Sequence, residues 1–105
     1  MAKYLLAYRG GGGMPERPEA QAQTMQAWGA WYASFDGTIV DPGDPCARAV
    51  TISSDGTAGA ETTPSLSGYT VIETESLDKA VAFARTCPVL AGGASIEVVE
   101  TFPAM

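Results

Sequence analysis

The sequence predicts a ferredoxin-like α+β fold, a two-layer sandwich with the element order βαββαβ. Residues 68–102 carry the strongest signal, because they have the pattern of a strand, a helix, a turn and a second strand. An apolar strand at residues 3–8 and an aromatic-rich helix at residues 18–35 precede them. The 105 residues suffice for a single domain, which we place at residues 1–105.

The first strand alternates Tyr4, Leu6 and Tyr8 on one face with aliphatic residues on the other. Apolar residues on both faces indicate a strand that is buried on both sides. The glycine run at residues 10–13 follows it. This run lacks the Gly-Lys-Ser/Thr ending of a phosphate loop and the spacing of a dinucleotide fingerprint. We interpret it as a flexible connection, and a flap over a pocket is the alternative.

The first helix is expected to begin at Pro18, a residue that suits the first turn of a helix, and to end near Phe35. Large apolar side chains recur every three or four residues and predict its buried stripe. These are Met25, Trp28, Trp31, Tyr32 and Phe35. Core packing is one interpretation of the two tryptophans. The alternative is that one of them lines a ligand pocket between the helix and the sheet.

The middle of the chain is rich in turn signals. A turn is expected at Asp36-Gly37 and a short extended piece at residues 38–41. Residues 47–53 alternate small or polar residues with larger ones and predict the second strand. The Asp55-Gly56 pair predicts another turn, and the Gly/Ala/Thr-rich residues after it predict a long loop.

The third strand is predicted at residues 69–74, which are mostly β-branched or aromatic. Ser76 is placed to cap a second helix, and Pro88 is placed to end it. Its apolar stripe is predicted from spacings of three and four, as Leu77, Ala80, Val81 and Ala84. A turn at Gly92-Gly93 precedes the last strand, in which Ile96, Val98 and Phe102 share one face.

The run SGYTVIETESLDKAVAFARTCPVLAGGASIEVVE resembles the C-terminal half of YCII-related (DGPF-domain) proteins. The shared pattern is a Gly-Tyr strand, a Leu-Asp-x-Ala helix ending in Cys-Pro, a Gly-Gly pair and a final Val/Glu-rich strand. The first strand and the tryptophan-bearing helix extend the resemblance over nearly the whole chain. The namesake Asp-Gly-Pro-Phe is half present, as Asp55-Gly56-Thr57-Ala58. The resemblance implies a dimeric α+β barrel, with enzyme roles in some branches of the family.

The chain contains no histidine, which excludes Ser-His-Asp and Cys-His catalysis and metal sites ligated by imidazole. A histidine–aspartate pair, which the resemblance implies for some branches, is therefore not transferable. Asp41, Asp44 and Asp55 match no calcium-loop spacing. We expect no cofactor and no metal. Cys46 and Cys87 form no C-x-x-C motif, so both are interpreted as small hydrophobic residues rather than as a disulfide.

The formal net charge of −6 disfavours binding to nucleic acids and to anionic membranes. No run of residues approaches the length of a membrane-spanning helix, and the N-terminus lacks the pattern of a secretory signal. We therefore expect a cytoplasmic protein with no nucleic-acid or membrane partner.

Two helices on one face of the sheet leave the other face apolar, and a second copy is expected to cover it, giving a homodimer through the sheet face. Two assignments of this face stay open at this point. One takes Leu5, Ile72 and Val99. The other takes the following residues: Tyr4, Leu6, Val71 and Val98.

We consider two functions. The first is a site for a small-molecule ligand in the cleft between the helices and the sheet, and catalysis at that site is left open. Tyr8, Trp28, Trp31 and Tyr32 are its candidate substrate-binding residues. The candidate catalytic residues are Arg9, which would orient a carboxylate or enolate, and Asp41, which would act as general base. Both are alternatively surface charges. The second function is a non-catalytic dimeric interaction or regulatory module.

Overall fold

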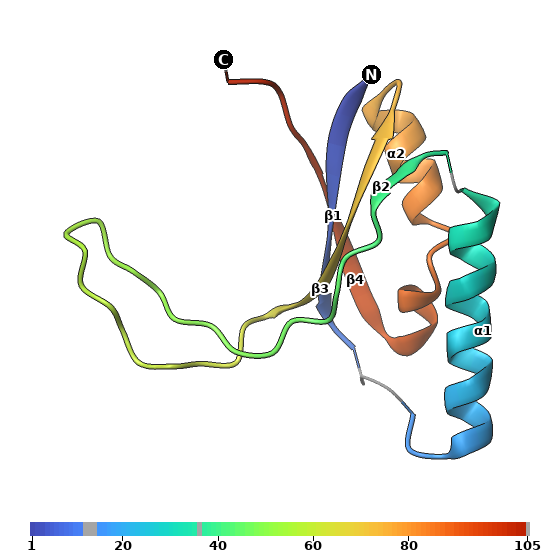
Figure 1. Cartoon of the computed structure of the whole chain (residues 1–105), viewed down its shortest axis with the longest axis horizontal. Coiled ribbons are helices and arrows are strands. Elements are labelled where there is room, and N and C mark those ends of the chain that lie inside the picture. The colour runs from blue at the N-terminus through green and yellow to red at the C-terminus, as the bar shows by residue number, and fades with distance from the viewer. Residues whose placement is uncertain (12–14, 36, 105) are drawn as a thin grey trace.

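A computed structural model describes residues 1–11, 15–35 and 37–104 and shows a four-stranded antiparallel sheet with two α-helices on one face (Figure 1). The elements are β1 (Ala2–Gly10), α1 (Pro18–Ser34), β2 (Ile39–Asp41), β3 (Leu66–Thr74), α2 (Leu77–Ala84), a 3₁₀ helix η1 (Pro88–Gly92) and β4 (Ala94–Glu100). The strand order β2-β3-β1-β4 confirms the predicted ferredoxin-like α+β fold. Two predictions, the second half of the glycine run and the turn residue Asp36, lie outside the described residues.

The register of the sheet determines which side chains meet the helices. Leu6 of β1 lies between Thr70 of β3 and Val98 of β4, and Tyr4 lies opposite Ile72. Leu6, Thr70 and Ile72 are fully buried, as expected for the centre of a two-layer core. Tyr4, Leu6 and Tyr8 share one buried face, as predicted, and the structure assigns that face to the helix side, a choice that the sequence had left open.

The α1 helix begins at the predicted Pro18, and Trp31 is its buried residue. Trp28, Tyr32 and Phe35 are half-buried, which agrees with the predicted stripe. Met25 is a correction, because 65% of its surface is exposed. Figure 1 shows why: the N-terminal half of α1 extends past the end of the sheet. Among the described residues, no helix is long and apolar enough to span a membrane.

The α2 helix has the predicted cap, since the Ser76 hydroxyl accepts a hydrogen bond from the Lys79 backbone N–H at 3.2 Å. Its buried face is rotated from the predicted stripe and consists of Ala80, Phe83 and Ala84. Leu77 is 42% exposed, which corrects its place in the stripe. The rotation brings the large Phe83 ring under α1, where its centroid lies 4.8 Å from that of Trp31.

The β4 strand ends at Glu100, so Phe102 is not part of it and is 84% exposed. The reason is the length of the neighbouring strand. Glu100 pairs with Tyr4, and Thr101 makes the next hydrogen bond, to the Lys3 carbonyl. In this register Phe102 would lie opposite Ala2, the first residue of β1, so the pairing runs out at this end of the strand. Pro103 follows at once, and proline cannot donate a ladder hydrogen bond. Ile96 and Val98 do face the helices and pack against the core, as predicted.

The second strand of the sheet is β2 at Ile39–Asp41, and the prediction of a sheet strand at residues 47–53 is wrong. Residues 47–63 form a separate two-legged projection, called here the arm (Figure 1). Antiparallel bridges join its legs at Ala49 with Thr62 and at Ile52 with Ala58. The predicted turn at Asp55-Gly56 lies at its tip, and the predicted loop after it is the returning leg.

The sheet face away from the helices, called here the open face, has Leu5 at its centre, paired with Val71 on one side and Val99 on the other. Both predicted versions of this face are corrected, because each mixed the two sides of the sheet. Ile72 is fully buried under the helices, whereas Val71 is on the open face. Hydrophobic alternation gives the two faces of each strand, and only the pairing register says which faces coincide.

Candidate functional site

Aromatic side chains fill the space between α1, α2 and the sheet. They follow α1 along its length and are called here the aromatic row: Tyr8, Trp28, Trp31, Tyr32, Phe35 and Phe83. At one end the Trp28 ring lies 5.8 Å from Tyr8, and at the other end Phe35 lies 4.2 Å from Phe83. The structure thus brings together the four predicted binding residues Tyr8, Trp28, Trp31 and Tyr32.

Trp31 is anchored in the middle of this row. Its indole N–H donates to the Thr86 hydroxyl at 2.9 Å, and that hydroxyl donates to the Phe83 carbonyl at 2.7 Å. Because indole has a single donor, Trp31 has no polar group left to offer a ligand. Its 5% exposure agrees with the core-packing interpretation. Trp28 and Tyr32 are half-buried and keep part of their rings at the surface.

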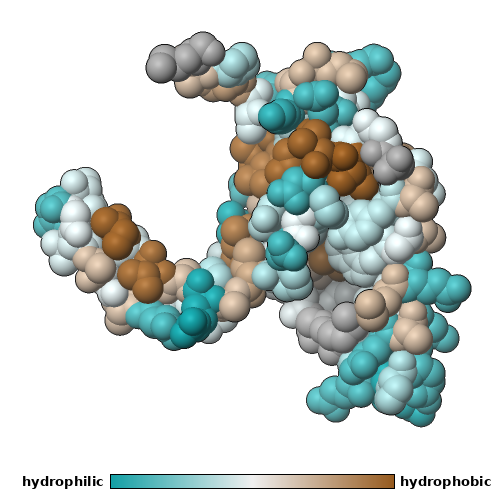
Figure 2. All heavy atoms as spheres, in the orientation of Figure 1, coloured by the Kyte–Doolittle hydropathy of each residue, from teal (hydrophilic) through white to brown (hydrophobic). Residues whose placement is uncertain are grey.

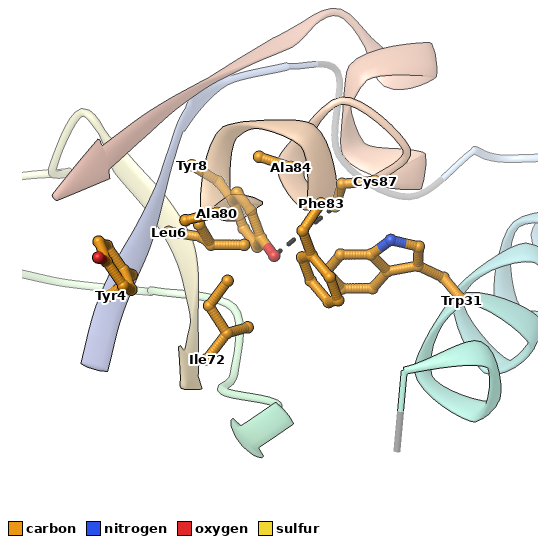
Figure 3. Close-up of a cluster of buried hydrophobic side chains, with 9 residues drawn as sticks. All are labelled: Tyr4, Leu6, Tyr8, Trp31, Ile72, Ala80, Phe83, Ala84 and Cys87. Carbon is orange, nitrogen blue, oxygen red and sulfur yellow. Dashed lines mark hydrogen bonds between the residues drawn. The ribbon is translucent and has the colours of Figure 1, made fainter. Parts of the chain in front are cut away.

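A chain of hydrogen bonds passes through the Tyr8 hydroxyl at one end of the row, and Figure 3 shows its bond to Cys87. The Thr70 hydroxyl donates its single hydrogen to the Pro42 carbonyl at 2.9 Å. The Tyr8 hydroxyl, 2.6 Å from the Thr70 oxygen, must then be the donor in that pair. The Cys87 thiol donates in turn to the Tyr8 oxygen at 3.6 Å. The order from donor to acceptor is therefore Cys87, Tyr8, Thr70 and Pro42.

Burial keeps the acidic members of this chain protonated. It raises the pKa of Tyr8 well above its ordinary value, more than the Thr70 hydrogen bond lowers it. Burial also raises the pKa of the Cys87 thiol, against a smaller lowering by the Val89 backbone N–H. A neutral, 3% exposed thiol is a poor nucleophile, so the network acts by holding the core residues in place. Both cysteines are free, and Cys87 is buried as expected of a small hydrophobic residue, whereas Cys46 is half-buried.

A hollow of about 290 Å³ opens at the opposite end of the row, between the end of α1, the start of α2 and the end of β3. It is called here the ring hollow, and its lining residues are Phe35, Thr38, Thr74, Lys79, Ala82 and Phe83. The Lys79 ammonium lies 2.6 Å from Glu75 Oε2, one helical turn away. That hydrogen bond lowers the pKa of Glu75. Both side chains are largely exposed, so the pair is readily exchanged for other partners.

A smaller hollow of about 140 Å³ lies between α2 and β4. Its lining is apolar except for Arg85. The lining residues are Val81, Ala84, Arg85, Leu90, Ile96 and Val98. It has no pair of convergent polar groups, and its volume is well below that of an ordinary ligand pocket. The ring hollow is the better candidate site.

The two predicted catalytic residues lie elsewhere and do not meet. Arg9 is on the open face, where its guanidinium contacts Glu97 at 3.2 Å and Ser65 at 2.9 Å. The exposed Asp41 accepts a hydrogen bond from the Gly43 backbone N–H at 2.9 Å. Neither residue lines the ring hollow. Within the described part of the chain, no group of three or more potential metal ligands comes together.

Several residues of the site were not found from the sequence. Thr70 looks like any β-branched residue of a strand, and Phe83 falls outside the predicted helix stripe. Lys79 had a local signal, because Glu75 precedes it by four residues, the spacing of a helical ion pair. Thr38 and Thr74 gave no local signal in the sequence. They meet because β2 and β3 are neighbours in the sheet, which the strand order alone decides.

Comparison with known proteins bears on the fold. No family model matches the chain, and no curated protein matches its sequence significantly. Among solved structures it is similar to 5-chloro-2-hydroxyhydroquinone dehydrochlorinase from Burkholderia phenoliruptrix, which was solved in complex with 2,5-dihydroxybenzoquinone. The match has a TM-score of 0.52 and 18% sequence identity, and it covers 92% of this chain and 91% of that chain. At this identity the likeness establishes a shared fold.

Proposed function

We propose that this protein is a YCII-related homodimer that binds a small, flat organic molecule in the ring hollow. The ring hollow is the observation that carries the ligand part. Its volume of about 290 Å³ is near the lower end of ordinary ligand pockets, so it suits a molecule with a single ring. The phenyl groups of Phe35 and Phe83, which pack against each other, together supply an apolar wall on which one face of such a ring can lie.

The polar lining favours a ring that carries oxygen substituents. Thr38 and Thr74 offer hydroxyls that donate or accept hydrogen bonds, and Lys79 offers a positive charge. A phenolate, carboxylate or quinone oxygen would take the place of Glu75 beside the ammonium at small cost, because the existing ion pair is solvent-exposed. The dehydrochlorinase of the same fold supports this class of ligand, since it was solved with a hydroxylated quinone.

The homodimer part rests on the open face. Leu5, Val71 and Val99 form its centre, and Val99 is 36% exposed. A soluble protein with an apolar sheet face gains stability when that face is covered, and two-fold pairing covers it with an identical patch. The YCII resemblance supports the same arrangement, because it implies a barrel formed from two sheets.

Isothermal titration calorimetry with 2,5-dihydroxybenzoquinone tests the ligand part, and the chain offers a matched pair of variants. Its two lysines are Lys3, on β1, and Lys79, in the hollow. We expect Lys79→Met to weaken binding about tenfold or more, because a charge-assisted hydrogen bond contributes about 1.5–3 kcal/mol. Lys3→Met should leave the Kd unchanged. No saturable binding, or equal Kd values for the two variants, would reject the hollow as the site.

An interaction or regulatory module is the second candidate function, and the arm is the observation that favours it. The arm stands apart from the rest of the chain and contributes nothing to the core. A stable dimer that shows no heat of binding with ring compounds would support this second candidate over the first.

A further inference from the structure

We propose that the arm is a clasp, which reaches around a second copy of this chain and buries Val50 and Ile52 against it. This clasp presupposes the homodimer proposed above and names the residues outside the sheet that hold it together. It assigns a role to residues 47–63, which take no part in the sheet, the core or the ring hollow.

In the single chain, the described polar contacts of the arm are all made within the arm. Its described hydrogen bonds all run between its own two legs or within its turn, as at Ala49 and Thr62, where both bonds are 2.8 Å long. The Arg48–Glu61 ion pair of 3.4 Å also joins one leg to the other. Residues 50–63 are exposed throughout. An isolated two-stranded ribbon is at best marginally stable in water, so it needs a surface to lie on.

The arm carries apolar side chains to this exposed position. Val50 is 50% exposed and Ile52 is 60% exposed, and two residues apart in an extended leg they share one face. Figure 2 shows the arm curving away from the rest of the molecule, with hydrophobic patches on the arm. An open space lies between the arm and the rest of the molecule. Figure 1 shows that the arm leaves on the side opposite the helices, which is the side of the open face.

The exposed area indicates an occupant of the size of another subunit. A compact monomer of 10.9 kDa exposes about 5,600 Å². This chain exposes 7209 Å², which is about 1,600 Å² more. Its radius of gyration of 15.4 Å likewise exceeds the roughly 13 Å of a compact domain of this length. Covering such an excess on each of two subunits gives an interface in the range of permanent dimers, about 2,000–5,000 Å² in total.

The reach of the arm fits the same partner. From residue 47 to the turn at Asp55, an extended leg spans about 27 Å at about 3.3 Å per residue. A second sheet packed on the open face would lie about 10 Å away, and its helices about another 10 Å beyond. The arm is thus long enough to pass the sheet of the second copy and reach its helix layer. In a two-fold pair, each subunit would clasp the other in the same way.

Sedimentation equilibrium of three double variants and the unchanged protein tests the clasp. Val50→Asp/Ile52→Asp is the clasp variant. Met25→Asp/Leu77→Asp is the charge-matched control, because both residues are exposed on the helix side. Leu5→Asp/Val99→Asp disrupts the open face. We expect the clasp variant to raise the dimer Kd at least about 100-fold while its circular dichroism spectrum is kept, and the control to leave the Kd within about threefold.

The outcomes separate the two proposals. If the clasp variant dimerises like the unchanged protein while Leu5→Asp/Val99→Asp is monomeric, the clasp is wrong and the sheet-face dimer stands. If the unchanged protein is a monomer at every concentration, both are wrong. Hydrogen exchange gives a readout without variants: backbone amides of residues 50–61 should exchange more slowly above the dimer Kd than below it. Equal exchange rates would overturn the clasp.

Discussion

Thr70 is the residue whose replacement tests the core network most directly. It is fully buried, and its hydroxyl donates to the Pro42 carbonyl while accepting from the Tyr8 hydroxyl at 2.6 Å. Thr70→Val keeps the shape of the side chain and removes both bonds. The Pro42 carbonyl can bond to water instead, because Pro42 is exposed, but Tyr8 is only 5% exposed, so its hydroxyl would lose its acceptor inside the core.

The cost is dominated by that one orphaned donor. A buried polar group without a partner costs about 1–3 kcal/mol, so we expect Thr70→Val to lose about 2 kcal/mol of unfolding free energy. For a domain of this size, that corresponds to a fall in Tm of roughly 8–16 °C. Urea unfolding followed by tryptophan fluorescence at a fixed protein concentration measures it, because dimerisation would otherwise change the apparent stability.

The double variant Tyr8→Phe/Thr70→Val distinguishes the network from simple packing. It removes the orphaned hydroxyl together with its lost acceptor, so it should be no less stable than Thr70→Val alone. Thr70→Ser, which keeps the hydroxyl and loses one methyl group, should cost about 1 kcal/mol. A Thr70→Val protein as stable as the unchanged one would refute the assigned bonds. The assigned bonds would also be refuted if the stability losses of Tyr8→Phe and Thr70→Val, measured separately, simply added up in the double variant.

Three further predictions follow from other parts of the structure. Burial raises the pKa of Cys87 and of Tyr8, so the folded state keeps protons that the unfolded chain releases. Stability should therefore be constant from about pH 7 to about pH 8.5 and should fall at higher pH, more steeply above about pH 10. Urea midpoints between pH 7 and pH 10.5 check this, and a flat profile would contradict it. Arg9→Ala and Asp41→Asn should leave the Kd for 2,5-dihydroxybenzoquinone within about twofold, because neither residue lines the ring hollow; a tenfold loss in calorimetry would return them to the site. Gly43→Ala should destabilise by at least about 2 kcal/mol, since Gly43 has a φ of 76° and an added Cβ would lie 1.7 Å from the Tyr69 carbonyl oxygen. The control Gly29→Ala, with nothing within 4 Å of its Cβ, should stabilise by about 1 kcal/mol in the same unfolding assay.

The sequence predicted what depends on local patterns. The start of α1 at Pro18, the Ser76 cap and the turn at Asp55-Gly56 each follow from the chemistry of one or two residues. The faces of β1 also follow locally, because alternation needs no knowledge of the neighbouring strands. These local signals were enough for the correct order of elements in a ferredoxin-like fold, with one strand assigned to the wrong residues.

What the sequence did not predict depends on how distant segments are paired. Val71 and Ile72 are adjacent and both β-branched or aliphatic, so only the pairing of Leu5 with Val71 shows which one faces the helices. Residues 47–53 alternate like a strand, yet the three-residue β2 takes that place in the sheet. The ring hollow likewise forms where Phe35, Thr74 and Lys79 converge from three elements, and no spacing in the chain anticipates it.

The separation of the arm from the core has a consequence for how this chain can change over time. Substitutions in residues 50–63 alter no buried contact, so they leave the folded subunit intact, whereas the residues of the aromatic row have little freedom to vary. Selection on the proposed clasp can therefore act on the arm while selection on stability acts on the core. In a laboratory, the same separation marks the Asp55-Gly56 tip as the place to insert a tag or a new peptide, because an exposed turn tolerates added length better than any packed segment.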